Sequence, residues 1–396
     1  MTGDRKAVGI TKLQKSYLVG RELNHSLGGV ACHAYLEISG GDIDATRLEW
    51  AWRRLMDRHV MTQVKIAKDA TVSAADDLMN NAFWLFDARS RSVAEAKGYL
   101  QDCRRNFSHR KMDLSRGQGC GLVLFLLPQK RSRMCFDIEL SICDVNGFQE
   151  MLNELALLYE YPQIADALPV WAEHADDAKD PEIIEMASLT ELFNYGANAG
   201  DLSGCRYVAL NETFDVPRRE RLCEYFEANG SDLFHGLLAC LLKSGDEAVK
   251  KDFVVNVPLF AVTAPGEDCV RDLTKIVWLK VEDIAEREVL EVARELKYQL
   301  AAQVEAKRPV HYTSADSLVP LVYSFNRNGV FLNEEFRRSF GNLTYMISQT
   351  PNVCLDVQLF RMTDGLLNSW VFPMEMMGTE RIERWFSRFV ELATRI

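Results

Sequence analysis

The segment FDIELSICDVNGFQEMLNELALLYE, residues 136–160, constrains the fold more than any other part of the sequence. It begins as an apolar, strand-like run that carries Asp137 and Glu139, reaches Asp144, and continues through a short Val-Asn-Gly turn into an apolar helix. Side chains alternate along a strand, so Asp137, Glu139 and Ser141 share one face. Because an unpaired ionised carboxylate is costly to bury, this face must meet water, a cation or a cavity.

Composition limits the class of protein. The chain has 396 residues, 47% of them hydrophobic, which is enough for one large core or two medium ones, and we expect two lobes. The net charge of -11 argues against nucleic-acid binding, which needs a basic face. No run of 18 apolar residues and no signal-peptide core occurs, so we expect no membrane contact and a cytoplasmic location. We also expect a monomer.

The familiar cofactor and nucleophile motifs do not occur in the sequence. Ten cysteines are present, but none forms a CxxC pair or a Cys/His cluster with zinc spacing, so we predict no metal site. Small buried side chains in a reducing compartment are the simplest interpretation of these cysteines. No GxSxG, P-loop, GxGxxG or HExxH motif is found.

Helix and strand patterns alternate through both halves of the chain, which predicts an α/β fold. The division we predict is an N-terminal lobe of residues 1–165, an acidic linker of residues 166–204 broken by Pro and Gly, and a C-terminal lobe of residues 205–396. Helices are expected near residues 45–59, 147–160, 218–230, 231–245 (capped by Ser231), 287–306 and 378–396, and strands near 120–128, 133–144, 206–216, 252–260, 275–284, 317–325 and 343–372.

Two further polar groups interrupt apolar strands near the C-terminus. In ISQTPNVCLDVQLF, Asp356 and Gln358 share a strand face, and Gln349 and Thr350 precede Pro351. In PLVYSFNRNG, Ser324 and Asn326 end an apolar run. Each group either ends a strand in water or lines a cavity, and the residues alone leave both possibilities open.

Seven motifs in collinear order resemble those of nonribosomal peptide synthetase heterocyclization domains, members of the condensation-domain superfamily. They are ITKLQKSYLVGRE, GGVACHAYLEI, FSHRKMDLSRGQ, VVNVPLF, VRDLTKIVWLKV, PLVYSF and ISQTPNVCLDVQLF. The last is similar to the family pattern S-Q-T-P-Q-V-x-L-D-x-Q and is the most specific match. The resemblance covers nearly the whole chain.

The resemblance assigns a role to the opening segment. Ordinary condensation domains carry H-H-x-x-x-D-G there, and heterocyclization domains carry two acids. Alignment on Asp144 puts Glu139 at the first acid, with Leu140 at the position of the condensation-type histidine. By this resemblance Asp144 is structural and Glu139 lines the floor of a tunnel. The chain departs from the family pattern at Glu139 (Asp in the family), Gly147 (Ser), Ser324 (Thr) and Val357 (often His).

The resemblance implies two chloramphenicol-acetyltransferase-like lobes in a V-shaped pseudodimer with a central tunnel. Donor and acceptor carrier proteins would dock at its two mouths, each with a thioester on a phosphopantetheine arm, and the domain would bind no cofactor itself. An amide would form with a Cys, Ser or Thr acceptor and lose water to give a thiazoline or oxazoline. Asp356 is the expected acid/base group, assisted by Ser324. Gln349, Thr350, Gln358 and Asn326 would line the pocket or support it.

Two alternatives are compatible with the same motifs. The first is an enzyme that forms only an amide or ester and does not dehydrate it. The second is a non-catalytic protein of the condensation fold that binds carrier proteins. The chain holds no adenylation or carrier segment, so it is expected to be either free-standing, which its Met1 start favours, or an excised domain.

Overall fold

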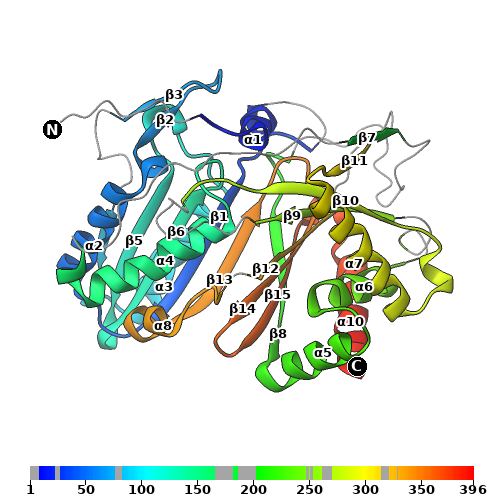
Figure 1. The fold of residues 1–396 in the computed structure, drawn as a ribbon. Coiled ribbons are helices and arrows are strands. Elements are labelled where there is room, and N and C mark those ends of the chain that lie inside the picture. The colour runs from blue at the N-terminus through cyan, green and yellow to red at the C-terminus, as the bar shows by residue number, and fades with distance from the viewer. Residues whose placement is uncertain are drawn as a thin grey trace.

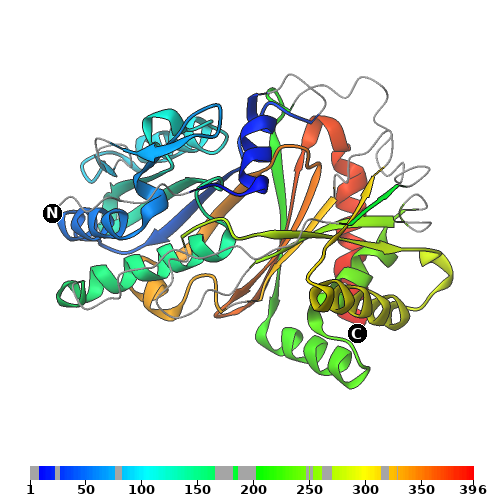
Figure 2. The same cartoon turned by 45° about the horizontal axis from the view of Figure 1, so that its top comes forward.

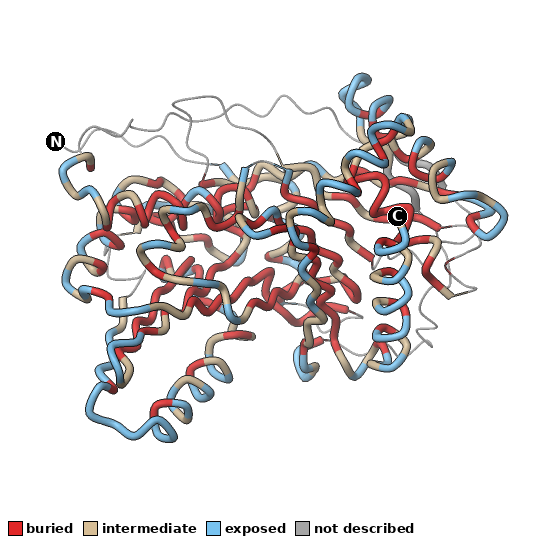
Figure 3. The backbone as a smooth tube through the Cα atoms, turned by 90° about the horizontal axis from the view of Figure 1, so that it is seen from below, coloured by how far each residue is buried: buried red, intermediate tan, exposed pale blue. Residues whose placement is uncertain are grey.

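The computed structural model describes residues 9–22, 27–75, 83–165, 182–185, 202–246, 249, 253–260, 270–313, 321–327 and 329–396. Two mixed sheets stand side by side, each with its own covering helices (Figures 1 and 2). The predicted α/β class is therefore confirmed. Burial is concentrated in the strands, whereas covering helices such as the C-terminal one alternate between buried and exposed residues (Figure 3).

The first sheet has five strands in the order β13-β1-β6-β5-β4. They are β1 (His33–Gly40), β4 (Phe83–Asp87), β5 (Cys120–Leu127), β6 (Arg131–Glu139) and β13 (Asn342–Gln349). Helices α2 (Ala45–Arg58), α4 (Val145–Glu160) and α8 (Glu334–Phe340) cover one face, and α3 (Val93–Phe107) contacts the other. On the first face Phe136 of β6 packs between the rings of Trp52 and Phe336, with centroids 6.3 and 6.4 Å away.

The second sheet has six strands in the order β10-β9-β12-β14-β15-β8. They are β8 (Tyr207–Asp215), β9 (Phe253–Leu259), β10 (Lys275–Val281), β12 (Leu321–Asn326), β14 (Leu355–Met362) and β15 (Gly365–Pro373). The helices packed against it are α5 (Val216–Ala228), α6 (Leu233–Ser244), α7 (Val289–Ala306) and α10 (Thr379–Arg395). Trp385 of α10 donates to the Leu241 carbonyl at 2.9 Å and meets Trp370 edge to face, which fixes α10 on the sheet.

The remaining elements are short or lie between the sheets. They are α1 (Lys12–Glu22), α9 (Met374–Met377), the antiparallel pair β2 (Val64–Ile66) and β3 (Val72–Ala74), and the parallel pair β7 (Glu182–Glu185) and β11 (Val310–Thr313). Helix α1, dark blue in Figure 1, lies above the junction of the two sheets. Within the described part of the chain, no helix has the length and apolar character needed to cross a membrane.

The boundary between the sheets does not follow the order of the chain. Strand β13 belongs to the predicted C-terminal lobe by sequence, yet it pairs antiparallel with β1, with Gln349 opposite His33. It also packs against β8 and β15 at the edge of the second sheet. Except for residues 182–185 and 202–204, the predicted linker of residues 166–204 lies outside the described residues.

Two local predictions need correction. The Val-Asn-Gly turn before α4 is the first turn of that helix, because the Asp144 carboxylate accepts the Gly147 N–H and caps it. Helix α6 is capped by Asp232 instead of Ser231, since its carboxylate accepts the His235 N–H at 3.1 Å. The predicted helix at residues 45–59 is confirmed as α2.

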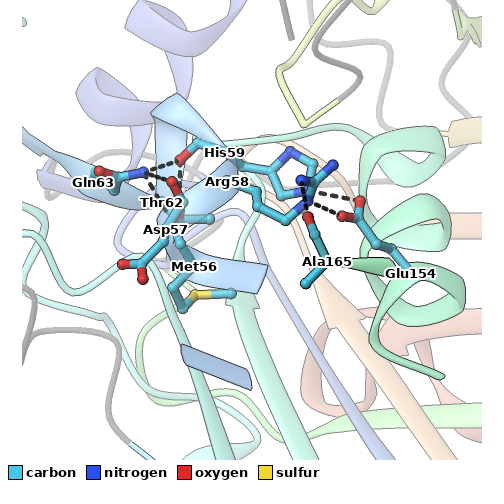
Figure 4. Close-up of polar contacts among 8 residues, drawn as sticks. All are labelled: Met56, Asp57, Arg58, His59, Thr62, Gln63, Glu154 and Ala165. Carbon is cyan, nitrogen blue, oxygen red and sulfur yellow. Dashed lines mark hydrogen bonds and ion pairs between the residues drawn. The ribbon is translucent and has the colours of Figure 1, made fainter. Parts of the chain in front are cut away.

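Side chains beyond the end of α2 bind its last carbonyl groups (Figure 4). The Gln63 amide donates to the carbonyls of Met56, Asp57 and His59 at 3.0, 2.8 and 3.2 Å. The Thr62 hydroxyl lies 2.7 Å from the carbonyls of Met56 and His59. The terminal carbonyls of a helix lack partners within it, so these side chains explain why α2 ends here without a glycine.

A buried ionic cluster joins the end of α2 to α4 (Figure 4). Glu154 pairs with Arg58 and lies 3.1 Å from the His59 ring nitrogen Nε2. Burial opposes ionisation of Glu154, but the hydrogen bonds and charges of His59 and Arg58 outweigh it and hold its pKa below the ordinary value.

Glu154→Gln is expected to lower the free energy of unfolding by about 3 kcal/mol, because it removes the carboxylate charge that pairs with the buried Arg58 guanidinium and the His59 ring. A group with a lowered folded-state pKa stabilises the protein above its unfolded pKa and loses that effect as the pH falls through the folded value. The difference between wild type and variant in denaturant melts should therefore shrink below about pH 4. Glu49→Gln, which breaks an exposed pair with Arg53, is the matched control; an equal loss in both variants would contradict the assignment.

Candidate functional site

One cavity of about 360 Å³ opens between the two sheets. Its wall combines α1, the start of α4 and Cys32 with residues of β9, β10, β12 and β14 and of the segment 350–353. Five of the eight residues singled out from the sequence line it, namely Asp356, Ser324, Gln358, Thr350 and Asp144.

Parallel pairing of β12 and β14 brings Ser324 and Asp356 to the same wall. Ser324 lies opposite Gln358 and Val322 lies opposite Asp356 in the register, so alternate side chains of both strands face the cavity. The Gln358 amide donates to Asp356 Oδ2 at 2.6 Å and to the Ser348 hydroxyl at 2.9 Å. This arrangement fixes one oxygen of the Asp356 carboxyl.

The second oxygen of Asp356, Oδ1, is buried and has no hydrogen-bond partner among the described residues. Burial raises the pKa of Asp356 to about 7, against the lowering effect of the hydrogen bonds from Gln358 and Ser348. A carboxyl group with this pKa is present in both protonation states near neutral pH, which suits a general acid/base. Thr350 lies nearby, with its hydroxyl 3.7 Å from the Cys32 sulfur.

Three predicted site residues do not line the cavity. Asn326 donates to Gln149 of α4 at 2.9 Å, and it is buried. Gln349 is buried in β13, and its amide lies 3.5 Å from the His109 carbonyl. Glu139, expected on the tunnel floor, is also absent from the wall. The parts of these three residues in a reaction stay predictions.

Glu139 is fully buried against a cation supplied by α1. Arg21 Nη1 lies 3.0 Å from Glu139 Oε1, and Arg21 Nη2 donates to the Met112 carbonyl at 2.7 Å. Burial raises the pKa of Glu139 to about 7 although Arg21 opposes the shift. Its neighbour on the same strand face, Asp137, pairs with Arg110. The acidic strand face thus meets cations and does not face water.

Helix α1 closes the cavity by close contact with the opposite wall. A Cβ at Gly20 would lie 2.5 Å from the Pro351 Cβ, so only glycine lets the helix approach this far. The Gln14 amide donates to the Ser141 carbonyl at 2.8 Å and fixes the other end of the helix. Tyr17, between them, lines the cavity.

Asp144 joins the start of α4 to the segment that leads into β10, and both contribute to the cavity wall. Its Oδ1 accepts the Gly147 N–H at 2.9 Å, and its Oδ2 accepts the Leu273 N–H at 3.2 Å, from the segment that leads into β10. Its own N–H donates to the Arg271 carbonyl at 3.0 Å. Both carboxylate oxygens are therefore committed to the backbone.

Asp144→Ala is expected to lower the free energy of unfolding by about 1–3 kcal/mol, because the cap of α4 and the bond to Leu273 are lost together. Asp144→Asn keeps one acceptor oxygen and should retain part of this stability. Urea denaturation compares the three proteins. If Asp144→Ala unfolds at the same urea midpoint as the wild type, the cap contributes nothing to stability.

Several cavity residues were quoted within motifs but were not selected from the sequence. Asp272 and Asn256 line the wall together with Tyr17 and Cys32. Asp272 stands in VRDLTK, where an acid before a strand reads as an ordinary turn residue. Its burial, at 2% exposure, is the signal that only the structure supplies. Among the described residues, no group of three His, Cys, Asp or Glu is placed to hold a metal ion.

Comparisons with known proteins agree on one family. No protein-family model matches this chain. It is 26% identical to the pyochelin synthetase PchE of Pseudomonas aeruginosa over 98% of its own length, and 26% identical to the phenyloxazoline synthase MbtB of Mycolicibacterium paratuberculosis over 93%. The chain spans 29% and 34% of these two relatives.

Solved structures show the same fold. The cyclization-docking bidomain of EpoB from Sorangium cellulosum superposes with a TM-score of 0.79 at 20% identity, covering 98% of this chain and 85% of that one. The first condensation domain of the CDA synthetase gives 0.67 at 14% identity, covering 99% and 97%. With its ordered motifs and its cavity between two mixed sheets, this chain has the fold of nonribosomal peptide synthetase cyclization and condensation domains and is similar to these synthetases over nearly its whole length.

Proposed function

We propose that this domain joins two carrier-bound thioesters and closes a five-membered ring on the product. The donor would carry an acyl or peptidyl group, and the acceptor would carry Cys, Ser or Thr, each on the phosphopantetheine arm of a carrier protein. The observation that carries the proposal is the free oxygen of Asp356, buried in a cavity that Ser324 also lines and that α1, the start of α4 and strands of the second sheet enclose.

The proposed reaction has two parts. The acceptor amine attacks the donor thioester, so that a C–N bond forms and the donor thiol leaves. The acceptor thiol or hydroxyl then attacks the new amide carbonyl, and loss of one water gives a thiazoline or oxazoline. Amide carbonyls are poor electrophiles, so this part needs a group that removes a proton from the nucleophile and returns one to the departing oxygen. We assign this role to Asp356, with the Ser324 hydroxyl as a hydrogen-bonding assistant.

The proposal extends to architecture and partners. We infer that the two sheets form chloramphenicol-acetyltransferase-like lobes in a V, near residues 1–165 and 205–396, with β13 exchanged between them. The cavity would be the middle of a tunnel with a carrier protein at each mouth. Holding both tethered substrates in line would supply much of the rate by proximity. We further propose a monomeric, cytoplasmic protein that binds no cofactor of its own.

The test is reconstitution with loaded donor and acceptor carrier proteins, followed by intact mass measurement. A product lighter by one water than the amide supports ring formation. An amide without water loss supports the condensation-only alternative, which the replacement of the family's Thr by Ser324 would favour. Carrier binding without any product supports the non-catalytic alternative.

A further inference from the structure

The cavity wall carries three carboxyl groups, Asp144, Asp272 and Asp356. No Lys, Arg or His is among the described residues that line it. Tyr17, on α1, lies within the field of all three, since burial and then the charges around it, these three acids included, raise its pKa. A concave site lined by one sign of charge favours a ligand group of the opposite sign. This cavity therefore favours a cationic group.

The three carboxyl groups differ in how many of their oxygens are free to accept a hydrogen bond from a ligand. Both oxygens of Asp144 accept backbone N–H groups, from Gly147 and Leu273. Asp272 Oδ1 accepts the Thr274 N–H at 3.1 Å, but its Oδ2 is buried without a partner among the described residues. Asp272 itself is 2% exposed. A buried acceptor left unsatisfied is costly, so Oδ2 is poised to receive a donor from the cavity.

Asp272 and Asp356 thus present two free oxygens to one cavity from separate segments, one before β10 and one in β14. The proposed reaction has two proton-handling tasks, at the acceptor amine and at ring closure. Burial raises the pKa of Asp272 to about 6, so its carboxylate is ionised near neutral pH and can pair with an ammonium group.

We propose that Asp272 binds the protonated α-amine of the acceptor aminoacyl thioester and takes one proton from it before attack. This inference rests on the proposed function and names its acceptor class, an amine whose own side chain carries no negative charge. The proton passes from the ammonium nitrogen to Asp272 Oδ2, leaving a neutral amine. When the C–N bond forms and the C–S bond breaks, the second proton of the amine goes to the departing thiolate.

The test measures binding apart from turnover. The probes are seryl-pantetheine in which an amide replaces the thioester, its N-acetyl derivative, and the aspartyl analogue, titrated by calorimetry. The wild type should bind the free amine about 10-fold or more tightly than the N-acetyl form, the scale of one hydrogen bond to a charged group. The aspartyl analogue should bind more weakly than the seryl one.

Asp272→Asn should lose this preference for the free amine, whereas Asp356→Asn should keep it. With loaded carriers, Asp272→Asn should slow amide formation, and Asp272→Glu should restore part of the rate. Equal binding of free and acetylated amines by the wild type would overturn the inference even if the variant does not fold. So would an unchanged preference in Asp272→Asn. If the preference holds but the wild type forms no product, the proposed reaction fails and the amine site stands.

Discussion

Asp356→Asn is expected to leave amide formation largely intact and to slow ring closure by about 10²-fold or more, the usual scale for losing a general acid/base. In the wild type the Gln358 amide donates a hydrogen bond to Asp356 Oδ2 at 2.6 Å, and the side-chain oxygen of asparagine can still accept it. It cannot take up or return a proton. The measurement is intact mass of the carrier-bound product over time, which separates the amide from the product that has lost water.

Two further variants make this result interpretable. Ser324→Ala should give a milder loss of the same step, because its hydroxyl assists without carrying the proton. Asp364→Asn, at an exposed carboxyl beyond the end of β14, is the matched control and should leave both steps unchanged. An equal loss of both steps in Asp356→Asn would mean a binding or folding defect and would remove the acid/base assignment.

Arg21→Met is expected to have the largest effect on stability, lowering the free energy of unfolding by about 3–5 kcal/mol. It leaves the Glu139 carboxyl buried without its cation and the Met112 carbonyl without a donor. Burial already raises the pKa of Glu139 to about 7, so protonation relieves part of this loss and places the result near the lower figure. Urea denaturation measures the change.

The double variant Arg21→Met with Glu139→Gln tests the pairing directly, because it removes both charges together. It should be more stable than Arg21→Met alone. Arg53→Met, which breaks an exposed pair with Glu49 on α2, should cost less than about 1 kcal/mol. A loss in Arg21→Met as small as that of Arg53→Met would show that the buried pair contributes little.

Sequence reasoning predicted the α/β class and five residues of the cavity wall because both depend on local patterns. Strand alternation placed Asp356 and Gln358 on one face, and the structure puts both on the cavity wall. The same alternation placed Asp137 and Glu139 on one strand face, but it did not decide whether that face meets water, a cation or a cavity. The choice depends on Arg21, which lies 118 positions before Glu139 and meets it only through the packing of α1. No local pattern contains that contact.

Asp272 shows the other limit of the sequence. An acid two residues before a threonine, where a strand begins, is common in exposed turns, and only burial distinguishes this one. The strand β13 was predicted, but its place in the first sheet was not, for a similar reason. The alternation of apolar and polar residues in β13 is compatible with either sheet. Its pairing with β1 depends on the free edge that β1 offers and not on the residues of β13 alone.

The placement of β13 has a consequence for anyone who would recombine domains of this fold. A chimera that joins the first half of one domain to the second half of another also exchanges the edge strand of the first sheet. In such a chimera, the strand that carries His33 comes from one parent and the strand that carries Gln349 comes from the other. This mixed strand pair lies seven residues before Asp356. Crossover points placed between the halves would therefore disturb the candidate site through a foreign strand pairing, and exchange of the undivided unit avoids this.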